Sequence, residues 1–115
     1  MTPVYLRIKL NAKIYREKEM QKQEVDELAA LLKALSHPIR LQILCLLQVK
    51  EMTVGEIRQD VKTTDANISQ HLNILRNQKI IGFRKEANFI YNRIIDDRVT
   101  KLIETMQNLF CTIKE

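Results

Sequence analysis

The sequence is poor in the residues that punctuate turns and β-sheets. Glycine and proline occur only twice each among 115 residues, and tryptophan is absent. This scarcity argues against a β-sandwich, whose many turns need both residues, and against the glycine-rich loop that cradles phosphate in nucleotide-binding enzymes. The composition therefore favours a single, mainly helical domain.

Long apolar runs are also missing. No stretch approaches the roughly 20 apolar residues that cross a bilayer. The first ten residues alternate charged with apolar side chains, whereas a signal peptide has an unbroken apolar segment. We therefore expect a cytoplasmic protein with no membrane partner.

Metal-ligating and catalytic residue types are scarce. The two cysteines, Cys45 and Cys111, lie far apart, which excludes a CxxC redox motif and a closely spaced zinc knuckle. Two histidines and scattered carboxylates form no nucleophile–base pair and no phosphate loop. We expect neither an enzyme nor a bound cofactor.

Hydrophobic spacing predicts two helices in the first half of the chain. Leucines at 28, 31, 32 and 35 form an i, i+3, i+4, i+7 stripe on a helix that ends near Ser36. Pro38 suits the first turn of the next helix, whose buried face would carry Ile39, Ile43, Leu46 and Leu47. We place the main domain at residues 25–115 and treat residues 1–24 as an N-terminal extension; residues 1–10 read either as a short strand or as a disordered leader.

Two capping signals predict a pair of short helices joined by a tight turn. Thr53 precedes Glu56 by three residues, which is the spacing of a capping box, and Val54, Ile57 and Val61 would face inward. Thr64 is a second cap, followed by apolar residues at 68, 72 and 75. Such a pair is a helix-turn-helix.

The pattern changes after Gly82. Phe83, Phe89 and Tyr91 flank a polar turn at residues 86–88, which predicts a two-stranded wing. From Arg98 onward a helix carries two apolar stripes, more than one partner would cover: Leu102, Met106, Leu109 and Ile113 on one, and Val99, Ile103 and Phe110 on the other. The fold class is mainly α with a small β-hairpin, a winged helix-turn-helix with four helices, two strands and a final helix.

Charge and amides point to a nucleic-acid surface on the second helix of the pair and on the wing. The chain carries a net charge of +5, and residues 76–93 contain five basic residues against one acidic. Amide and imidazole groups can reach base edges in a major groove, while hydroxyls and cations contact phosphates. The candidate DNA-binding residues are Thr64, Asn67, Ser69, Gln70, His71, Asn73, Arg76, Arg84, Lys85 and Arg93.

Three features qualify this interpretation. The same polar residues could simply solvate the outer face of an amphipathic helix. A lone histidine such as His71 is more often structural than a base reader. Asp65 would repel phosphate unless it points away or stabilises the start of its helix.

Four segments together resemble the ArsR/SmtB family of winged-helix repressors: "LLKALSHPIRLQILCLL", "EMTVGEI", "ISQHLNILRNQKIIGFRKE" and "FIYNRI". The resemblance covers residues 30–111. It implies a homodimer joined through the first and last helices of the domain, which binds an imperfect palindrome in double-stranded DNA and releases it when an inducer binds.

The resemblance also limits which kinds of inducer this protein is expected to sense. The paired cysteines that bind metals in many members of the family are absent from residues 51–56, and the last helix lacks the histidine of a second metal site. Cys45 and Cys111, in "LQILC" and "NLFC", resemble the dithiol branch, which implies that both thiols sense reactive sulfur species or oxidants. The alternatives are a repressor that responds to reactive oxygen species or to a metal, with buried structural cysteines, or a site built from both thiols and His37. Outside the repressors, the apolar last helix is compatible with a protein-interaction module.

Overall fold

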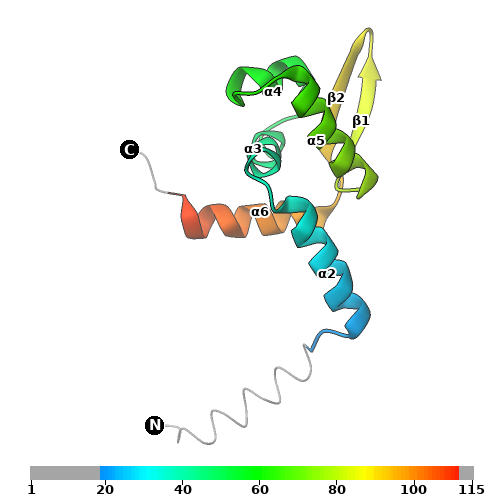
Figure 1. Cartoon of the computed structure of the whole chain (residues 1–115), viewed down its shortest axis with the longest axis vertical. Coiled ribbons are helices and arrows are strands. Elements are labelled where there is room, and N and C mark those ends of the chain that lie inside the picture. The colour runs from blue at the N-terminus through cyan, green and yellow to red at the C-terminus, as the bar shows by residue number, and fades with distance from the viewer. Residues whose placement is uncertain (1–18, 112–115) are drawn as a thin grey trace, which may run out of the picture. The chain divides into compact units, whose positions relative to one another are not determined.

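The computed structural model describes residues 19–111, in which five helices and one hairpin follow one another along the chain (Figure 1). The predicted order of four helices, two strands and a final helix is confirmed. The expected strand or leader at residues 1–10 and the apolar Ile113 lie outside the described residues. The elements are α2 (Lys22–Leu35), α3 (Pro38–Leu47), α4 (Val54–Asp60), α5 (Asp65–Asn77), β1 (Ile81–Glu86), β2 (Phe89–Ile94) and α6 (Asp97–Phe110).

The chain divides into two compact units, Met1–Leu31 and Leu32–Glu115. In the first unit, the described part of α2 exposes Val25 and Leu28. The second unit contains the end of α2, where Ala34 and Leu35 are buried, and all the elements from α3 to α6. The domain boundary expected between residues 24 and 25 stays a prediction.

Side-chain caps fix where the helices of the second unit begin. The Oγ1 of Thr53 accepts the N–H of Glu56 at 3.2 Å, and Glu56 accepts the N–H of Thr53 in return, so the predicted capping box is confirmed. Thr64 caps α5 by accepting the N–H of Asn67 at 3.1 Å. Before Pro38, His37 caps α3 through its Nδ1, which accepts the N–H of Ile39.

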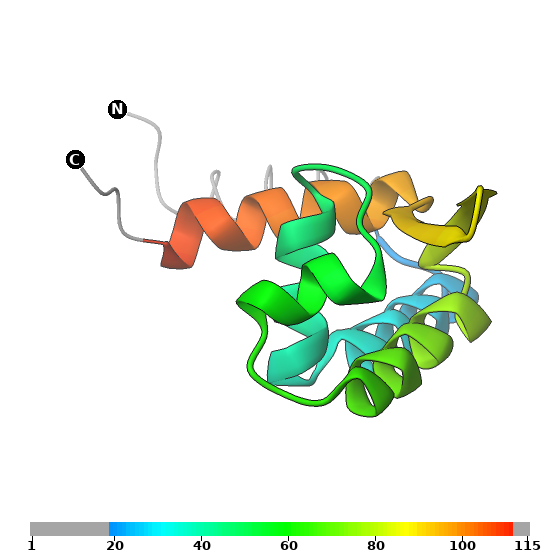
Figure 2. The same ribbon diagram turned by 90° about the horizontal axis from the view of Figure 1, so that it is seen from above.

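The core of the second unit is built around α3, which lies between α6 and the α4–α5 pair (Figures 1 and 2). Because α3 is covered on more than one side, Leu44 is buried, whereas Leu46, expected to be inward, is only half-buried. Each large aliphatic side chain buried in this way stabilises the fold by about 1.5–3 kcal/mol. The fully buried residues of α3, α5 and α6 are Ile43, Leu44, Ile68, Leu72, Leu75, Val99 and Ile103.

The wing is an antiparallel hairpin in which Phe83 pairs with Asn92 and Arg84 with Tyr91. Its two-residue turn has Ala87 at φ 54°, in the left-handed region that costs a non-glycine residue about 1–2 kcal/mol. On the other side of β2, Met52 of the α3–α4 connector exchanges two main-chain hydrogen bonds with Asn92, at 3.1 and 2.8 Å. The connector thus adds one residue of a third strand to the wing.

Among residues 19–111, no single helix is long and apolar enough to cross a membrane, and only Lys22–Leu35 and Pro38–Val49, taken together across a sharp bend, pass by length and composition. The apolar character of α3 in that pair is explained by the core, in which Ile43, Leu44 and Leu47 are buried.

Candidate nucleic-acid interface and thiol pocket

The predicted DNA-contacting residues on α5 differ in their accessibility. Gln70 and Asn73 are exposed, whereas Asn67 and Ser69 are half-buried. The amide of Asn67 donates to Thr63 Oγ1 at 2.8 Å, so its position is already fixed by the turn before α5. The helix α5 and its cap therefore offer two exposed amides, one amide that is held in place, and the hydroxyl of Thr64.

The expectation that His71 belongs to this exposed face is wrong. Only 8% of His71 is exposed; its ring lies 4.3 Å from that of His37, and its Nδ1 accepts a hydrogen bond from Arg40 Nε at 3.3 Å. Burial, then the charges of His37 and Arg40, lower the pKa of His71. Helical spacing carried a signal for this, because position 71 is three residues after buried Ile68 and four before buried Leu75.

Arg76 is not free to extend into solvent. Its Nη2 donates to Asn92 Oδ1 at 2.5 Å and its Nη1 to Asn73 Oδ1 at 3.0 Å. The guanidinium lies over the ring of Phe83, 5.1 Å from the centroid. Burial lowers the pKa of Arg76, although an arginine stays charged in proteins. Its charge is thus placed between α5 and the wing.

The wing cations differ in how they are engaged. Arg84 Nη1 contacts Glu86 at 2.7 Å and its Nε contacts Glu51 at 2.6 Å, while its guanidinium lies over the Tyr91 ring. The hydrogen bonds to Glu86 and Glu51 raise the pKa of Arg84. Lys85 and Arg93 are exposed, and no ion pair to either is found among the described residues. They are the wing cations most available to an anion.

Asp65 pairs with Arg58 of α4 at 3.3 Å. The carboxylate also lies in the first turn of α5, where a negative charge is favourable. Both partners are well exposed, so this pair contributes little to stability. The residue that seemed to repel phosphate is thus partly neutralised by its neighbour.

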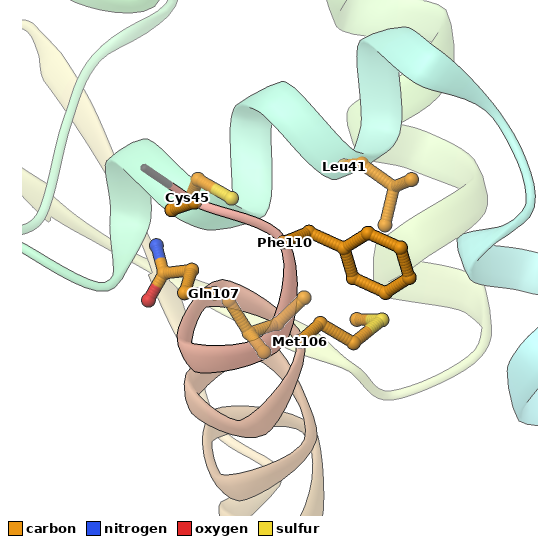
Figure 3. Close-up of a pocket in the computed structure, with 7 residues that line it drawn as sticks. Leu41, Cys45, Met106, Gln107 and Phe110 are labelled. Carbon is orange, nitrogen blue, oxygen red and sulfur yellow. The ribbon is translucent and has the colours of Figure 1, made fainter. Parts of the chain in front are cut away.

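The two cysteines, far apart in sequence, line one cavity of about 290 Å³ between α3 and α6. In Figure 3, Cys45 of α3 and the side chains of Met106, Gln107 and Phe110 of α6 lie around the same space. Cys111 follows the last turn of α6, and its N–H donates to Gln107 O at 2.8 Å. The remaining lining residues are Leu41 and Ile103.

The environments of the two thiols are unequal. Cys45 is half-buried and Cys111 is exposed. Burial raises the pKa of the Cys45 thiol, a hydrogen bond with Gln107 lowers it, and the charge of Cys111 raises it again. The two thiols therefore line the same cavity in different surroundings.

Among the described residues, no group of three histidine, cysteine, aspartate or glutamate side chains could hold a metal ion. His37, considered with the two thiols in one alternative, has its Nδ1 engaged at the start of α3.

The sequence did not indicate the roles of three residues: Glu51, Asn92 and Gln107. For Asn92 a signal existed, because it shares a strand face with Ile90 and Ile94.

The four helices, the hairpin and the last helix define a winged helix-turn-helix protein. Residues 37–81 match the family described as "Bacterial regulatory protein, arsR family". The "Biofilm growth-associated repressor" of Agrobacterium fabrum is 37% identical over 81% of this chain and 80% of its own length. The chain belongs to the arsR family and is a transcriptional regulator.

Two further relatives have solved structures. The structure of the transcriptional repressor BigR from Xylella fastidiosa has a TM-score of 0.76 at 33% identity, and the match covers 85% of this chain and 98% of that one. The "Transcriptional activator HlyU" of Vibrio cholerae is 36% identical over 81% of this chain and 85% of its own length. Its structure, described as reduced HlyU, has a TM-score of 0.76 at 33% identity over 79% of this chain and 96% of that one.

Proposed function

We propose that this protein is a non-enzymatic, homodimeric repressor that binds an imperfect palindrome in double-stranded DNA and releases it when Cys45 and Cys111 react with reactive sulfur species. The observation that carries the proposal is the shared pocket: two thiols that are distant in sequence line one apolar cavity between α3 and α6.

The DNA-binding part of the proposal rests on α5 and the wing. Gln70 and Asn73 are exposed amides on the second helix of the pair, which is the helix that enters the major groove in this motif. Lys85 and Arg93 supply exposed positive charge on the neighbouring hairpin. Amides can contact base edges and cations can contact phosphates, so the surface has candidates for both sequence-specific and phosphate contacts. Buried His71 is not among the residues proposed here.

The dimer part rests on apolar side chains left in solvent. Leu109 and Phe110, at the end of α6, are 74% and 84% exposed. The described part of α2 separately exposes Val25, Leu28 and Leu32. A second copy would cover such residues with the same residues of its own, as a twofold interface requires.

The switch part rests on thiol chemistry. With an organic trisulfide, one cysteine thiolate attacks the central sulfur and expels one RS⁻; the other cysteine attacks the same sulfur and expels the second RS⁻. The two cysteines are then joined through one added sulfur, both thiols are oxidised and two RSH are formed. A preference of about 2–3 kcal/mol for the low-affinity conformer would lower operator affinity about 30- to 150-fold.

The experiment begins with an operator selected from random duplexes by the reduced protein. Its affinity is then measured before and after treatment with glutathione trisulfide, and again after a thiol reductant. We expect a loss of operator affinity of about 30- to 150-fold that the reductant reverses, together with a mass gain of one sulfur less two hydrogens. Cys45→Ser and Cys111→Ser should bind the operator as the wild type does and lose the response.

Three results would contradict or change the proposal. A cysteine variant that still releases DNA under trisulfide would exclude the dithiol switch. An equal response to peroxide, with a mass loss of two hydrogens, would favour a general oxidant sensor. A monomer that selects no duplex would favour a protein-interaction module.

A further inference from the structure

Asn92 is a polar side chain at the centre of the wing junction, and 0% of it is exposed. Its main-chain N–H and C=O pair with Met52, its Oδ1 accepts from Arg76, and its Nδ2 donates to Met52 O at 3.1 Å. Each polar group of this residue therefore has a partner. Those partners come from α5 and from the α3–α4 connector, so one residue of β2 joins three parts of the fold.

The contacts of Arg76 extend the junction along α5. Besides Asn92, its guanidinium contacts Asn73 on its own helix and lies over Phe83 of β1. It therefore touches both strands of the wing as well as the helix that carries the proposed base readers. Its buried Nε has no hydrogen-bond partner among the described residues.

A second tether lies beside the first. Arg84 of β1 contacts Glu51, which precedes Met52 in the connector. Met52 in turn precedes Thr53, the cap of α4. The wing is thereby joined to the start of the helix-turn-helix as well as to its second helix.

The wing needs such tethers, because a two-stranded hairpin is at best marginally stable by itself. In this hairpin, most residues from Phe83 to Ile90 are exposed, so little apolar packing fixes the tip. Removing the Asn92 amide would leave the half-buried guanidinium of Arg76 without its Asn92 partner and would remove one donor from Met52 O.

We propose that Asn92 and Arg76 are positioning residues, which hold Lys85 and Arg93 of the wing at a fixed place relative to α5. The inference rests on the proposed DNA binding and reassigns Arg76, which the sequence suggested as a direct DNA contact. The alternative is that Arg76 contacts phosphate itself. The positioning role and the direct contact predict different results for a variant that keeps the positive charge of residue 76 but loses the hydrogen bond to Asn92.

Two substitutions keep every formal charge. Asn92→Leu preserves approximate size and removes the amide; Arg76→Lys preserves the charge and loses the planar guanidinium that reaches Asn92. Asn77→Ala, at the exposed end of α5, is the matched control. For each protein, operator affinity is measured over a salt series, well below the unfolding midpoint, and amide hydrogen exchange is followed in the free protein.

We expect both variants to lose affinity on the order of tenfold at physiological salt. The slope of log K against log salt should fall by up to about 1.8, because two phosphate contacts worth about 0.9 each are lost although no charge is removed. The amides of Met52 and of β2 should exchange faster. Asn77→Ala should match the wild type in all three measurements.

A direct phosphate contact by Arg76 would instead leave Arg76→Lys close to the wild type in affinity and slope, and that result would overturn the inference. Wild-type exchange rates in both variants would overturn it as well. If Asn92→Leu does not fold, Arg76→Lys carries the test alone. If the wild type selects no duplex, the proposed function fails, and the exchange rates alone decide whether these residues hold the wing.

Discussion

At the scale of single residues, His71 shows how a polar side chain on the predicted recognition helix can serve the core. Its Nδ1 accepts a hydrogen bond from Arg40, and its ring packs against His37. Burial, together with the neighbouring His37 and Arg40, lowers the pKa of His71 and favours its neutral imidazole. Arg40 also donates to Ala34 O at 2.7 Å, which links this cluster to the end of α2.

Stability should therefore fall in mild acid. The pKa of His71 is lowered from its ordinary value of 6.5, so below pH 6.5 the unfolded state binds a proton that the folded state resists. The free energy of unfolding should decrease as the pH falls from 6.5 towards the folded pKa. Urea titrations between pH 7.5 and 5 measure this, and His71→Gln, which keeps an acceptor for Arg40, should show a shallower decrease. Equal decreases in both proteins would contradict the assignment.

At the scale of elements, α5 and the wing have complementary chemistry. The exposed amide of Gln70 belongs to a regular, capped helix, and the exposed ammonium of Lys85 belongs to a hairpin strand. A base contact depends on sequence, whereas a phosphate contact depends on charge. The two elements should therefore fail in different ways when altered.

Replacing Gln70 by Ala should reduce discrimination between the operator and a base-substituted duplex by about 1–3 kcal/mol, because a bidentate base contact would be lost. Replacing Lys85 by Gln should weaken binding to all duplexes and lower the salt slope by about 0.9. Fluorescence anisotropy with both duplexes over a salt series distinguishes the effects. Lys101→Gln on α6 is the matched control, and a Gln70 variant with unchanged discrimination would exclude a reading role.

The local elements could be predicted from the sequence because their signals lie within a few residues. Thr53, Thr64 and Pro38 mark helix starts, and the change of period after Gly82 marks the wing. Partners that are distant in the chain could not be predicted. Nothing local pairs Glu51 with Arg84 or Met52 with Asn92, and the charge count over residues 76–93 included Glu86 but not Glu51, the other carboxylate that contacts Arg84. The thiol pair came from a resemblance, since spacing alone left the cysteines as possible core residues.

At the scale of the whole molecule, the end of α6 contributes both to the thiol pocket and to the proposed dimer contact. Phe110 lines the thiol pocket, while Leu109 beside it is exposed and takes no part in that lining. A second copy that covers this end would cover residues next to the pocket. Dimer formation and thiol chemistry would then involve neighbouring parts of one helix.

Leu109→Glu should separate the two copies. Burying this leucine stabilises by about 1.5–3 kcal/mol, and twofold symmetry counts it twice, so the dimer dissociation constant should rise at least about 100-fold. Sedimentation velocity over a concentration series measures the shift. Asn108→Glu, an equal charge change on an adjacent exposed position, should have a smaller effect. A dimer of unchanged affinity in the leucine variant would place the interface elsewhere.

The bridge between Met52 and Asn92 has a practical consequence for protein engineering. A hairpin that shares a strand pairing with the connector and a buried amide with α5 is not a portable module. Transplanting this hairpin onto another scaffold requires transferring Met52 and Arg76 as well, because Asn92 would otherwise lose the partners that fix the hairpin.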